Sequence, residues 1–257
     1  MKILLLGDVV GEPGMDALER ELPALRRELG ADFTLIDGEN TCLNGTTPAH
    51  AERLLRAGAD VVTLGNHAFD RREIADMLEQ DERLLRPANL PRLPGRGSGI
   101  YEACHRPVGV LVLQGRAEMD HGPDNPFLTA EAEVEKLRAS CKVVLVEIHA
   151  EATSEKQAMF YQLAGKVSVV FGTHTHVQTA DETLWQGTGY LTDLGLCGPR
   201  YSVVGVEPKW SVDYFRNGRA MFPKAAAGGE RVICGLLCDV DEKTGECLSL
   251  RRIMKKA

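Results

Sequence analysis

The chain has 257 residues, of which 44% are hydrophobic and 26% charged, and this composition predicts one globular domain spanning residues 1–257. Its formal net charge of −7 argues against a broad nucleic-acid-binding surface. No apolar stretch approaches the roughly 20 residues that span a bilayer, and the N-terminal run KILLL is too short for a signal peptide, so we expect no membrane partner.

Short apolar runs rich in β-branched residues recur along the chain and predict strands. Amphipathic segments of helical length lie between several of these runs. Strands that alternate with helices predict an α/β protein whose strands are largely buried. In chain order the runs are KILLLGD (2–8), FTLIDGEN (33–40), ADVVTLGNH (59–67), VGVLVLQG (108–115), CKVVLVEIHAE (141–151), KVSVVFGTHTH (166–176) and TGYLTDLG (188–195).

Four segments predict helices. The clearest is 47–58, with Thr47 as the N-cap, Pro48 at the first helical position and Gly58 beyond the end. Pro23 lies inside a further predicted helix and favours a kink or an early restart there. The other predicted helices are 17–29, 129–140 and 153–165.

The C-terminal part of the chain has a different pattern. Residues 231–241 and 247–254 predict a β-hairpin joined by EKTGE, and 218–230 predicts an exposed loop. Cys234 and Cys238 fall on one face of the first hairpin strand, which indicates packing. The seven cysteines are scattered and include no CxxC pair, so we expect reduced thiols in a cytoplasmic protein.

Polar residues with metal-binding capacity follow five of the predicted strands. In open α/β sheets, functional groups gather beyond the carboxyl ends of the strands, so these side chains are expected to meet in one place. Four of the seven histidines are among them. The residues are Asp8, Glu39, Asn40, Asn66, His67, His149, His174 and His176.

Each of these residues also has an ordinary structural explanation. Asp8 and Asn66 suit turns, and His149 alone could be a buried, hydrogen-bonded histidine. The pair His174 and His176 would point to one side of an extended chain, as two metal ligands would. The repetition of ligand types at successive strand ends favours a metal site over these separate explanations.

The motifs GD, GEN, GNH and GTHTH, in this order, resemble the calcineurin-like metallophosphoesterase superfamily. The match extends over nearly the whole chain. It is most similar to the YmdB-like bacterial branch, whose members are cyclic-nucleotide phosphodiesterases. The motifs of this branch are GDVVG, GENT, GNHAFD, RPANLP, EIHAEATSEK, GTHTHVQTAD and TDLGLCGP. The resemblance implies a four-layer α/β-β-α sandwich of two mixed β-sheets flanked by helices, and we expect the C-terminal hairpin in the second sheet.

The chain departs from the wider superfamily at two positions and from the YmdB-like branch at one. The usual Asp-x-His motif is Asp8-Val9-Val10 here, so one imidazole ligand is missing. Glu39 replaces the usual bridging Asp, and in the YmdB-like branch the following residue, here Asn40, takes the vacant ligand position. Phe69 stands where that branch has Trp, which would alter only the shape of the pocket.

The resemblance implies two metal ions. Asp8, Glu39, Asn40 and His176 would hold one, and Glu39, Asn66, His149 and His174 would hold the other, with Glu39 bridging. A bridging carboxylate and a bridging hydroxide would offset the repulsion between the cations and leave about one positive charge, which favours a phosphate ester. Oxygen and nitrogen ligands without a thiolate suit iron or manganese, with zinc as a further candidate.

His67 is the expected general acid. The hydroxide would attack phosphorus in line, and the leaving alkoxide opposite needs a proton that an imidazole can supply. The simpler alternative for His67 is support of a neighbouring ligand. Glu151, Thr153 and Ser154 are explained by a helix start, with Thr153 or Ser154 as its cap, and Arg116 by an exposed position, although each could also contact substrate.

The residues themselves predict a two-metal enzyme that acts on a phosphate ester. The resemblance implies a phosphodiesterase whose substrates are small cyclic nucleotides, particularly 2′,3′-cyclic nucleoside monophosphates, with 3′,5′-cyclic ones as further candidates. Two alternatives remain open, a phosphomonoesterase that uses the same site and a non-catalytic regulatory scaffold. An amidohydrolase-type enzyme is disfavoured because its His-x-His pair is expected near the first strand of a barrel. A homo-oligomer is possible in principle, but no periodic apolar stripe identifies an interface.

Overall fold

The structure is a computed structural model that describes residues 1–119, 122–218 and 224–257. Within these residues the strands form two mixed sheets. The first has the order β2 (Asp8–Val9), β12 (Leu196–Pro199), β13 (Arg231–Val240), β1 (Lys2–Leu6), β3 (Phe33–Asp37), β4 (Val61–Thr63) and β5 (Leu84–Leu85), with β14 (Cys247–Lys256) paired to β13. The second has the order β10 (Thr183–Trp185), β11 (Thr188–Leu191), β9 (Val169–Thr173), β8 (Val143–His149), β7 (Arg106–Gln114) and β6 (Ser98–Ala103).

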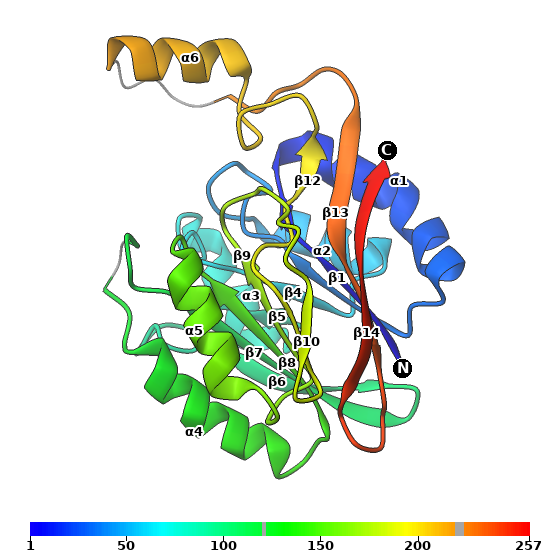
Figure 1. Cartoon of the computed structure of the whole chain (residues 1–257). Helices are drawn as coiled ribbons and strands as arrows, with labels where there is room; N and C mark the ends of the chain where they lie inside the picture. The colour runs from blue at the N-terminus through cyan, green and yellow to red at the C-terminus, as the bar shows by residue number, and fades with distance from the viewer. Residues whose placement is uncertain (120–121, 219–223) are drawn as a thin grey trace.

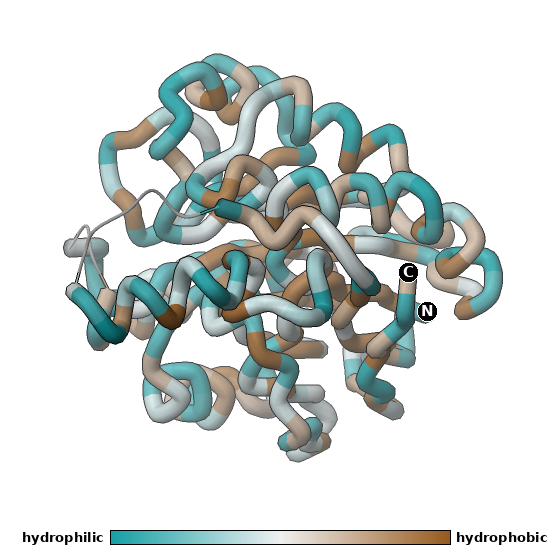
Figure 2. The backbone as a smooth tube through the Cα atoms, turned by 90° about the horizontal axis from the view of Figure 1, so that it is seen from above, coloured by the Kyte–Doolittle hydropathy of each residue, from teal (hydrophilic) through white to brown (hydrophobic). Residues whose placement is uncertain are grey.

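Helices cover the outer face of each sheet (Figure 1). The first sheet carries α1 (Gly11–Leu29), α2 (Pro48–Ala57) and α3 (Ala75–Gln80), which follows a 3-10 turn at Arg72–Ile74. The second sheet carries α4 (Pro126–Arg138) and α5 (Thr153–Leu163). The outer helices alternate between hydrophilic and hydrophobic residues along their length (Figure 2). The predicted four-layer α/β-β-α sandwich is therefore confirmed.

The alternation of side chains along β1 explains the layering. Ile3 and Leu5 pack between the sheets, whereas Leu4 and Leu6 pack against the helices over the first sheet. Successive residues of a strand point to opposite faces, so a run that is apolar throughout must be buried on both sides. The core between the sheets also contains Phe33 and Phe171, one from each sheet.

The strands that bear the predicted site run parallel. β1, β3, β4 and β5 pair in parallel in the first sheet, and β7, β8, β9 and β11 do so in the second. Their carboxyl ends therefore meet at one edge of the sandwich.

The C-terminal hairpin forms as predicted but joins a different sheet. β13 pairs antiparallel with both β14 and β1, so the hairpin extends the first sheet rather than the second. The apolar residues of β13 pack in the same layers of the core as those of β1. The pattern within the hairpin does not show which of the two sheets it joins.

Two helices begin earlier than predicted. α1 begins earlier and does not restart at Pro23, which is exposed on the helix while Leu22 and Leu25 pack into the core on either side. α4 begins at Pro126 because the side chain of Asn125 accepts a hydrogen bond from the Phe127 amide.

The start of α5 also corrects the predicted cap. Ala152 is the N-cap and has no capping side chain, so neither Thr153 nor Ser154 fills that role. The expected features of α2 are present: Thr47 accepts a hydrogen bond from the His50 amide and Gly58 follows the helix.

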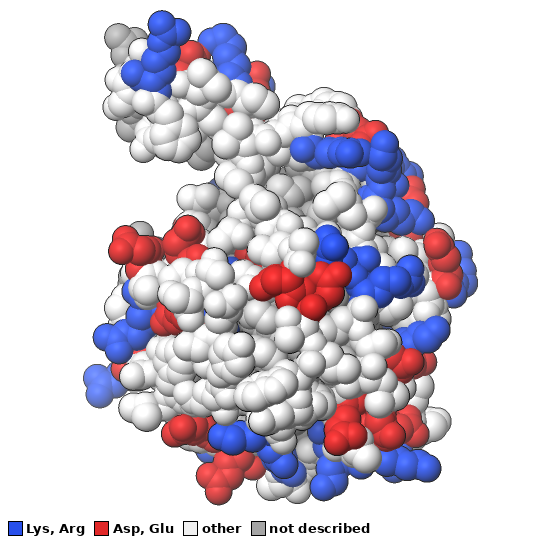
Figure 3. All heavy atoms as spheres, viewed as in Figure 1, with Lys and Arg blue, Asp and Glu red and all other residues white. Residues whose placement is uncertain are grey.

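One helix, α6 (Pro208–Asn217), stands apart from the body of the molecule (Figures 1 and 3). Its apolar residues Val212 and Phe215 are exposed. The loop expected at 218–230 lies partly outside the described residues. None of the helices in the described ranges is both long and apolar enough to cross a lipid bilayer.

Candidate metal centre

The eight polar residues predicted at the strand ends come together at one edge of the sandwich. A pocket of about 390 Å³ opens there. Glu39, Asn40, His67, His174 and His176 line it. The other three, Asp8, Asn66 and His149, lie within hydrogen-bond or ion-pair distance of these lining residues or of each other. Whether they bind metal remains a prediction.

Three of the predicted ligand atoms surround one imidazole nitrogen. The Nε2 atom of His149 lies 2.9 Å from Oδ1 of Asn66, 3.1 Å from Oε1 of Glu39 and 3.1 Å from Nδ1 of His174. Glu39, His149 and His174 also each offer a ligand atom within 4.8 Å of the others. Together with Asn66, they are the four residues that the resemblance assigns to one ion.

The opposite nitrogen of His149 explains why Nε2 is available as a ligand. Nδ1 lies 2.8 Å from Oγ1 of Thr173 and 3.2 Å from Oδ2 of Asp37. Because the Thr173 hydroxyl donates to Glu147, it can accept a hydrogen bond from Nδ1–H. In the neutral imidazole, a proton on Nδ1 would leave a lone pair on Nε2, which faces the oxygens of Asn66 and Glu39. A cation bound in place of a proton on Nε2 would then meet a converging set of acceptors.

His176 has the same arrangement at the second predicted ion. Its Nδ1 lies 2.8 Å from the carbonyl oxygen of Val204, which can only accept, so Nδ1 carries the proton. Its Nε2 lies 3.1 Å from Oδ1 of Asn40 and 3.5 Å from Oδ1 of Asp8. The Asn40 amide nitrogen donates to the Leu43 carbonyl at 2.7 Å, which turns the amide oxygen toward the site. Carboxylate, amide and imidazole groups thus fit the implied oxygen and nitrogen ligand set.

His67 lies beside the predicted ligands. Its backbone amide donates to Oε2 of Glu39 at 3.1 Å, and its Nδ1 lies 2.7 Å from Oδ2 of Asp70. The Asp70 carboxylate therefore orients the imidazole and leaves Nε2 as the nitrogen available for proton transfer.

Buried carboxyl groups outnumber buried lysines around the site. In the described part of the chain, five carboxylates are at most 1% exposed, and Lys156 is the only lysine buried with them. Burial, then the neighbouring charge of Asp37, raises the pKa of Asp8, and the same two causes raise the pKa of Glu147. Bound cations would offset the charge that burial opposes. The carboxylates are Asp8, Asp37, Glu39, Glu147 and Asp193.

The pKa values of His174 and Glu39 are both lowered at the site, but for different reasons. Burial lowers the pKa of His174 to about 3, and the charge of His149 adds to the effect, so His174 is neutral and able to act as a ligand. Burial opposes the charge of both His149 and Glu39, but Glu39 and Asp37 raise the pKa of His149 well above its ordinary value, and the resulting charge on His149 lowers the pKa of Glu39 to about 2. Glu39 is therefore an anion throughout the ordinary pH range, as a bridging carboxylate must be. A bound cation would take the place of the added proton on His149.

Gly65, which follows β4, lies directly against the imidazole ring of His149. A Cβ atom at this position would lie 2.3 Å from two atoms of the His149 ring. The first residue of the GNH motif is thus restricted to glycine by the imidazole that packs against it.

The predicted extended geometry of the His174 and His176 pair is wrong, although the residues do converge. β9 ends at Thr173, and His174 and His176 have φ values of 93° and 64°, so the pair does not lie on an extended strand. The chain after β4 likewise turns at once, because the Ala68 amide donates to the Gly65 carbonyl. The loops direct these side chains by turn geometry.

Sequence reasoning missed two carboxylates of the site. Asp37 ends β3, fully buried, and contacts His149; a charged residue at the end of an apolar strand was the available signal. Asp70 pairs with His67 three residues away, within the same GNHAFD motif. Asp8, Asp37 and His149 also form a close group of potential ligand atoms.

The secondary candidates divide into two groups. Glu151 lines the pocket, with Oε2 3.3 Å from Nε2 of His174, so it is more than a helix-start residue. Arg116 is exposed and is absent from the described lining of the pocket. Phe69 also lies outside that lining and packs against the core, so its expected effect on pocket shape is indirect at most.

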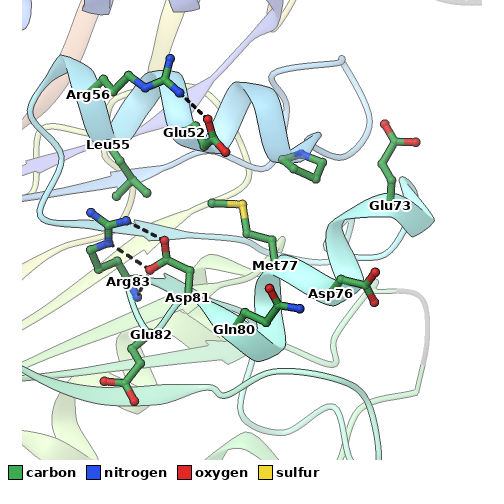
Figure 4. Close-up of a pocket in the computed structure, with 11 residues that line it drawn as sticks. Glu52, Leu55, Arg56, Glu73, Asp76, Met77, Gln80, Asp81, Glu82 and Arg83 are labelled. Atoms are coloured by element: carbon green, nitrogen blue, oxygen red, sulfur yellow. Dashed lines mark hydrogen bonds and ion pairs between the residues drawn. The ribbon is translucent and has the colours of Figure 1, made fainter.

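A larger hollow, of about 1010 Å³, lies between α2 and α3 (Figure 4). Its charged groups are partly paired with one another, Arg56 with Glu52 and Arg83 with Asp81. Its described lining includes no histidine. The pocket at the strand ends is therefore the better candidate for chemistry.

Comparisons with known proteins identify the family of the chain. A family model described as "YmdB-like protein" matches residues 4–253. The chain is 36% identical over 257 residues to the 2′,3′-cyclic-nucleotide 2′-phosphodiesterase of Bacillus subtilis (strain 168), covering 99% of this chain and 97% of the relative.

Two crystal structures share the whole fold. A hypothetical protein from Thermus thermophilus matches with a TM-score of 0.91 and 35% identity, over 100% of this chain and 99% of that one. A phosphatase from Mycoplasma pneumoniae matches with a TM-score of 0.91 and 31% identity, over 100% and 93% of the two chains. With a family model and a relative both matching nearly end to end, the chain belongs to the YmdB-like protein family.

Proposed function

We propose that this protein is a metal-dependent phosphodiesterase that hydrolyses 2′,3′-cyclic nucleoside monophosphates, with 3′,5′-cyclic nucleoside monophosphates as second candidate substrates. The observation that carries the proposal is the convergence of Asn66, Glu39 and His174 on the Nε2 atom of His149. The name of the Bacillus subtilis relative supports the substrate class.

Two cations are proposed at the site, with iron or manganese preferred and zinc as a third candidate. Asp8, Glu39, Asn40 and His176 would hold one; Glu39, Asn66, His149 and His174 would hold the other. When bound, the cations would lower the pKa of a coordinated water molecule and offset the charge of the phosphate.

The chain's own residues would orient the substrate and supply the proton. Glu39 carries its negative charge at the centre of the site, where the His67 amide donates to it. His67, oriented by Asp70, would deliver a proton from Nε2 to the leaving alkoxide. Glu151 borders the same pocket and would contact the bound substrate or a water molecule there. It is not proposed to act on the phosphorus atom.

The test is a comparison of four substrates with the Mn²⁺-loaded protein. Preference for a 2′,3′-cyclic nucleotide over a 3′,5′-cyclic one, and for bis-p-nitrophenyl phosphate over p-nitrophenyl phosphate, is expected. Faster hydrolysis of the monoester would favour a phosphomonoesterase instead. No turnover of any of the four by fully loaded protein would favour a regulatory scaffold.

The proposal also covers the domain organisation, the localisation and the oligomeric state of the protein. Residues 1–257 would unfold as one cooperative domain, since the core between the sheets draws on both. The seven free cysteines support a reducing, cytoplasmic setting. The exposed Val212 and Phe215 of α6 support a homo-oligomer, which light scattering on the purified protein would test.

A further inference from the structure

The short loop after β9 is held by charged side chains rather than by a strand ladder. The His174 amide donates to both carboxylate oxygens of Asp8, at 3.2 and 3.3 Å. The Thr175 amide donates to Oδ2 of Asp193 at 3.1 Å. The Thr173 carbonyl accepts from Nζ of Lys156 at 2.7 Å. The backbone groups of three consecutive residues, Thr173, His174 and Thr175, are thus hydrogen-bonded to buried ionisable side chains.

Lys156 has no role in the proposed chemistry. It lies in α5, is 0% exposed and donates from Nζ to Oδ2 of Asp193 at 2.8 Å. A buried ammonium group is costly unless it is paired and hydrogen-bonded, and here both conditions are met. Gly172 leaves room for its stem, because a Cβ there would lie 2.7 Å from Cδ of Lys156 and 1.9 Å from the Thr192 carbonyl oxygen.

Asp193 connects this lysine to the loop. Its Oδ2 accepts from the Thr175 hydroxyl at 2.8 Å as well as from the Thr175 amide, and its Oδ1 accepts from the Gly195 amide at 2.9 Å. Asp193 is 0% exposed. The ion pair therefore joins α5, the end of β9 and the segment between β11 and β12 beneath the two histidines.

The loop needs this support because its backbone is unusual. His174 and His176 both have positive φ values, a region that non-glycine residues rarely occupy unless surrounding contacts impose it. The side chain at Thr175, between them, is fixed by the carboxylate of Asp193. Loss of the pair would allow the loop to relax toward ordinary backbone angles and would turn both imidazoles.

We propose that Lys156 and Asp193 are a positioning pair that sets the orientation of His174 and His176 toward the proposed metal ions. The inference rests on the proposed function, since it assumes that these two histidines are ligands. Neither Lys156 nor Asp193 is proposed to touch metal or substrate.

The experiment measures Mn²⁺ affinity by titration calorimetry, and thermal unfolding of the metal-free protein, for wild type, Lys156→Met, Asp193→Asn and the double variant. We expect each variant to bind Mn²⁺ at least about 10-fold more weakly, the effect typical of losing a residue that orients a ligand. Removing both charges together should recover part of the stability that each single change loses, but not the affinity. Thr175→Val removes only the hydroxyl contact and should show a smaller loss of Mn²⁺ affinity. It provides a second test of the same loop if Lys156→Met does not fold.

Arg86 offers a matched control. It is also buried, at 7% exposure, and its guanidinium donates to the carbonyls of Leu93, Pro94 and Gly95 in a loop that is not part of the site. Arg86→Met should destabilise the protein without changing Mn²⁺ affinity.

Two results would overturn the inference in distinguishable ways. If wild type binds Mn²⁺ and the folded variants at Lys156, Asp193 and Thr175 bind it within twofold of wild type, the pair is only structural. If wild type itself binds no Mn²⁺, the proposed metal centre is wrong and the positioning role is lost with it.

Discussion

Oε1 of Glu39, from the loop after β3, lies 3.1 Å from Nε2 of His149 at the end of β8. The two residues come from different sheets and are separated by 110 positions in the chain. Because both groups are buried, this contact has little access to water as a substitute partner. It is the point at which the two sheets jointly form the proposed site.

Replacing Glu39 with Gln should abolish metal binding at one or both positions. The amide keeps the shape but removes the negative charge that would lie between two cations. We expect metal content, measured by elemental analysis, to fall from two ions per chain to one or fewer and kcat to fall at least about 100-fold. Glu52→Gln, in the hollow between α2 and α3, should leave both unchanged.

A Glu39→Gln protein that retains two ions and near wild-type kcat would show that this carboxylate does not bridge.

Replacing His67 with Gln should retain both metal ions and lower kcat by about 100-fold or more for a cyclic nucleotide, whose alkoxide leaving group needs a proton. The loss should be much smaller for bis-p-nitrophenyl phosphate, because p-nitrophenolate leaves without protonation. Asp70→Asn should show the same pattern at lower amplitude, since it disturbs only the orientation of the ring.

An equal loss of kcat for both substrates would count against a general acid. Loss of metal from His67→Gln would instead make His67 a ligand.

Much of this architecture could be predicted from sequence because it depends on local pattern. The apolar runs of β1, β3, β8 and β9, and the caps of α2, specify elements whose parallel ends must meet. The prediction did not include the strands β2, β5, β6, β10 and β12. β2 and β5 have only two residues each, which carry no periodic signal.

The details of the site could not be predicted in the same way. Asp37 and Lys156 look like ordinary residues of a strand and a helix, and only tertiary contacts show which buried charge balances which. The His174 and Thr175 amides, in the loop where His174 and His176 have positive φ values, donate to the carboxylates of Asp8 and Asp193, which are distant in sequence.

Replacing Gly65 with Ala should disturb His149 directly. The new methyl group would overlap the ring, and overpacking of this kind costs about 1–3 kcal/mol. We expect a lower Tm and weaker metal binding together. Gly228→Ala, where a Cβ meets no atom within 4 Å, is the matched control and should change neither.

If Gly65→Ala binds metal as wild type does, the close approach of β4 to His149 is not needed for the site.

Removing metal with a chelator should lower both activity and stability. Cations that bind only the folded state add about 2.7 kcal/mol at a concentration 100 times their Kd. We expect Tm to fall on chelation and to recover, with activity, on addition of Mn²⁺ or Fe²⁺. An unchanged Tm in fully stripped protein would mean that the buried carboxylates do not hold cations.

Anomalous diffraction from crystals grown with Mn²⁺ and soaked in phosphate tests the central claim most directly. Two anomalous peaks are expected, one beside Asp8, Asn40 and His176 and the other beside Asn66, His149 and His174, with Glu39 between them and phosphate facing both. A single peak, or peaks away from Glu39, would contradict a two-metal phosphodiesterase site.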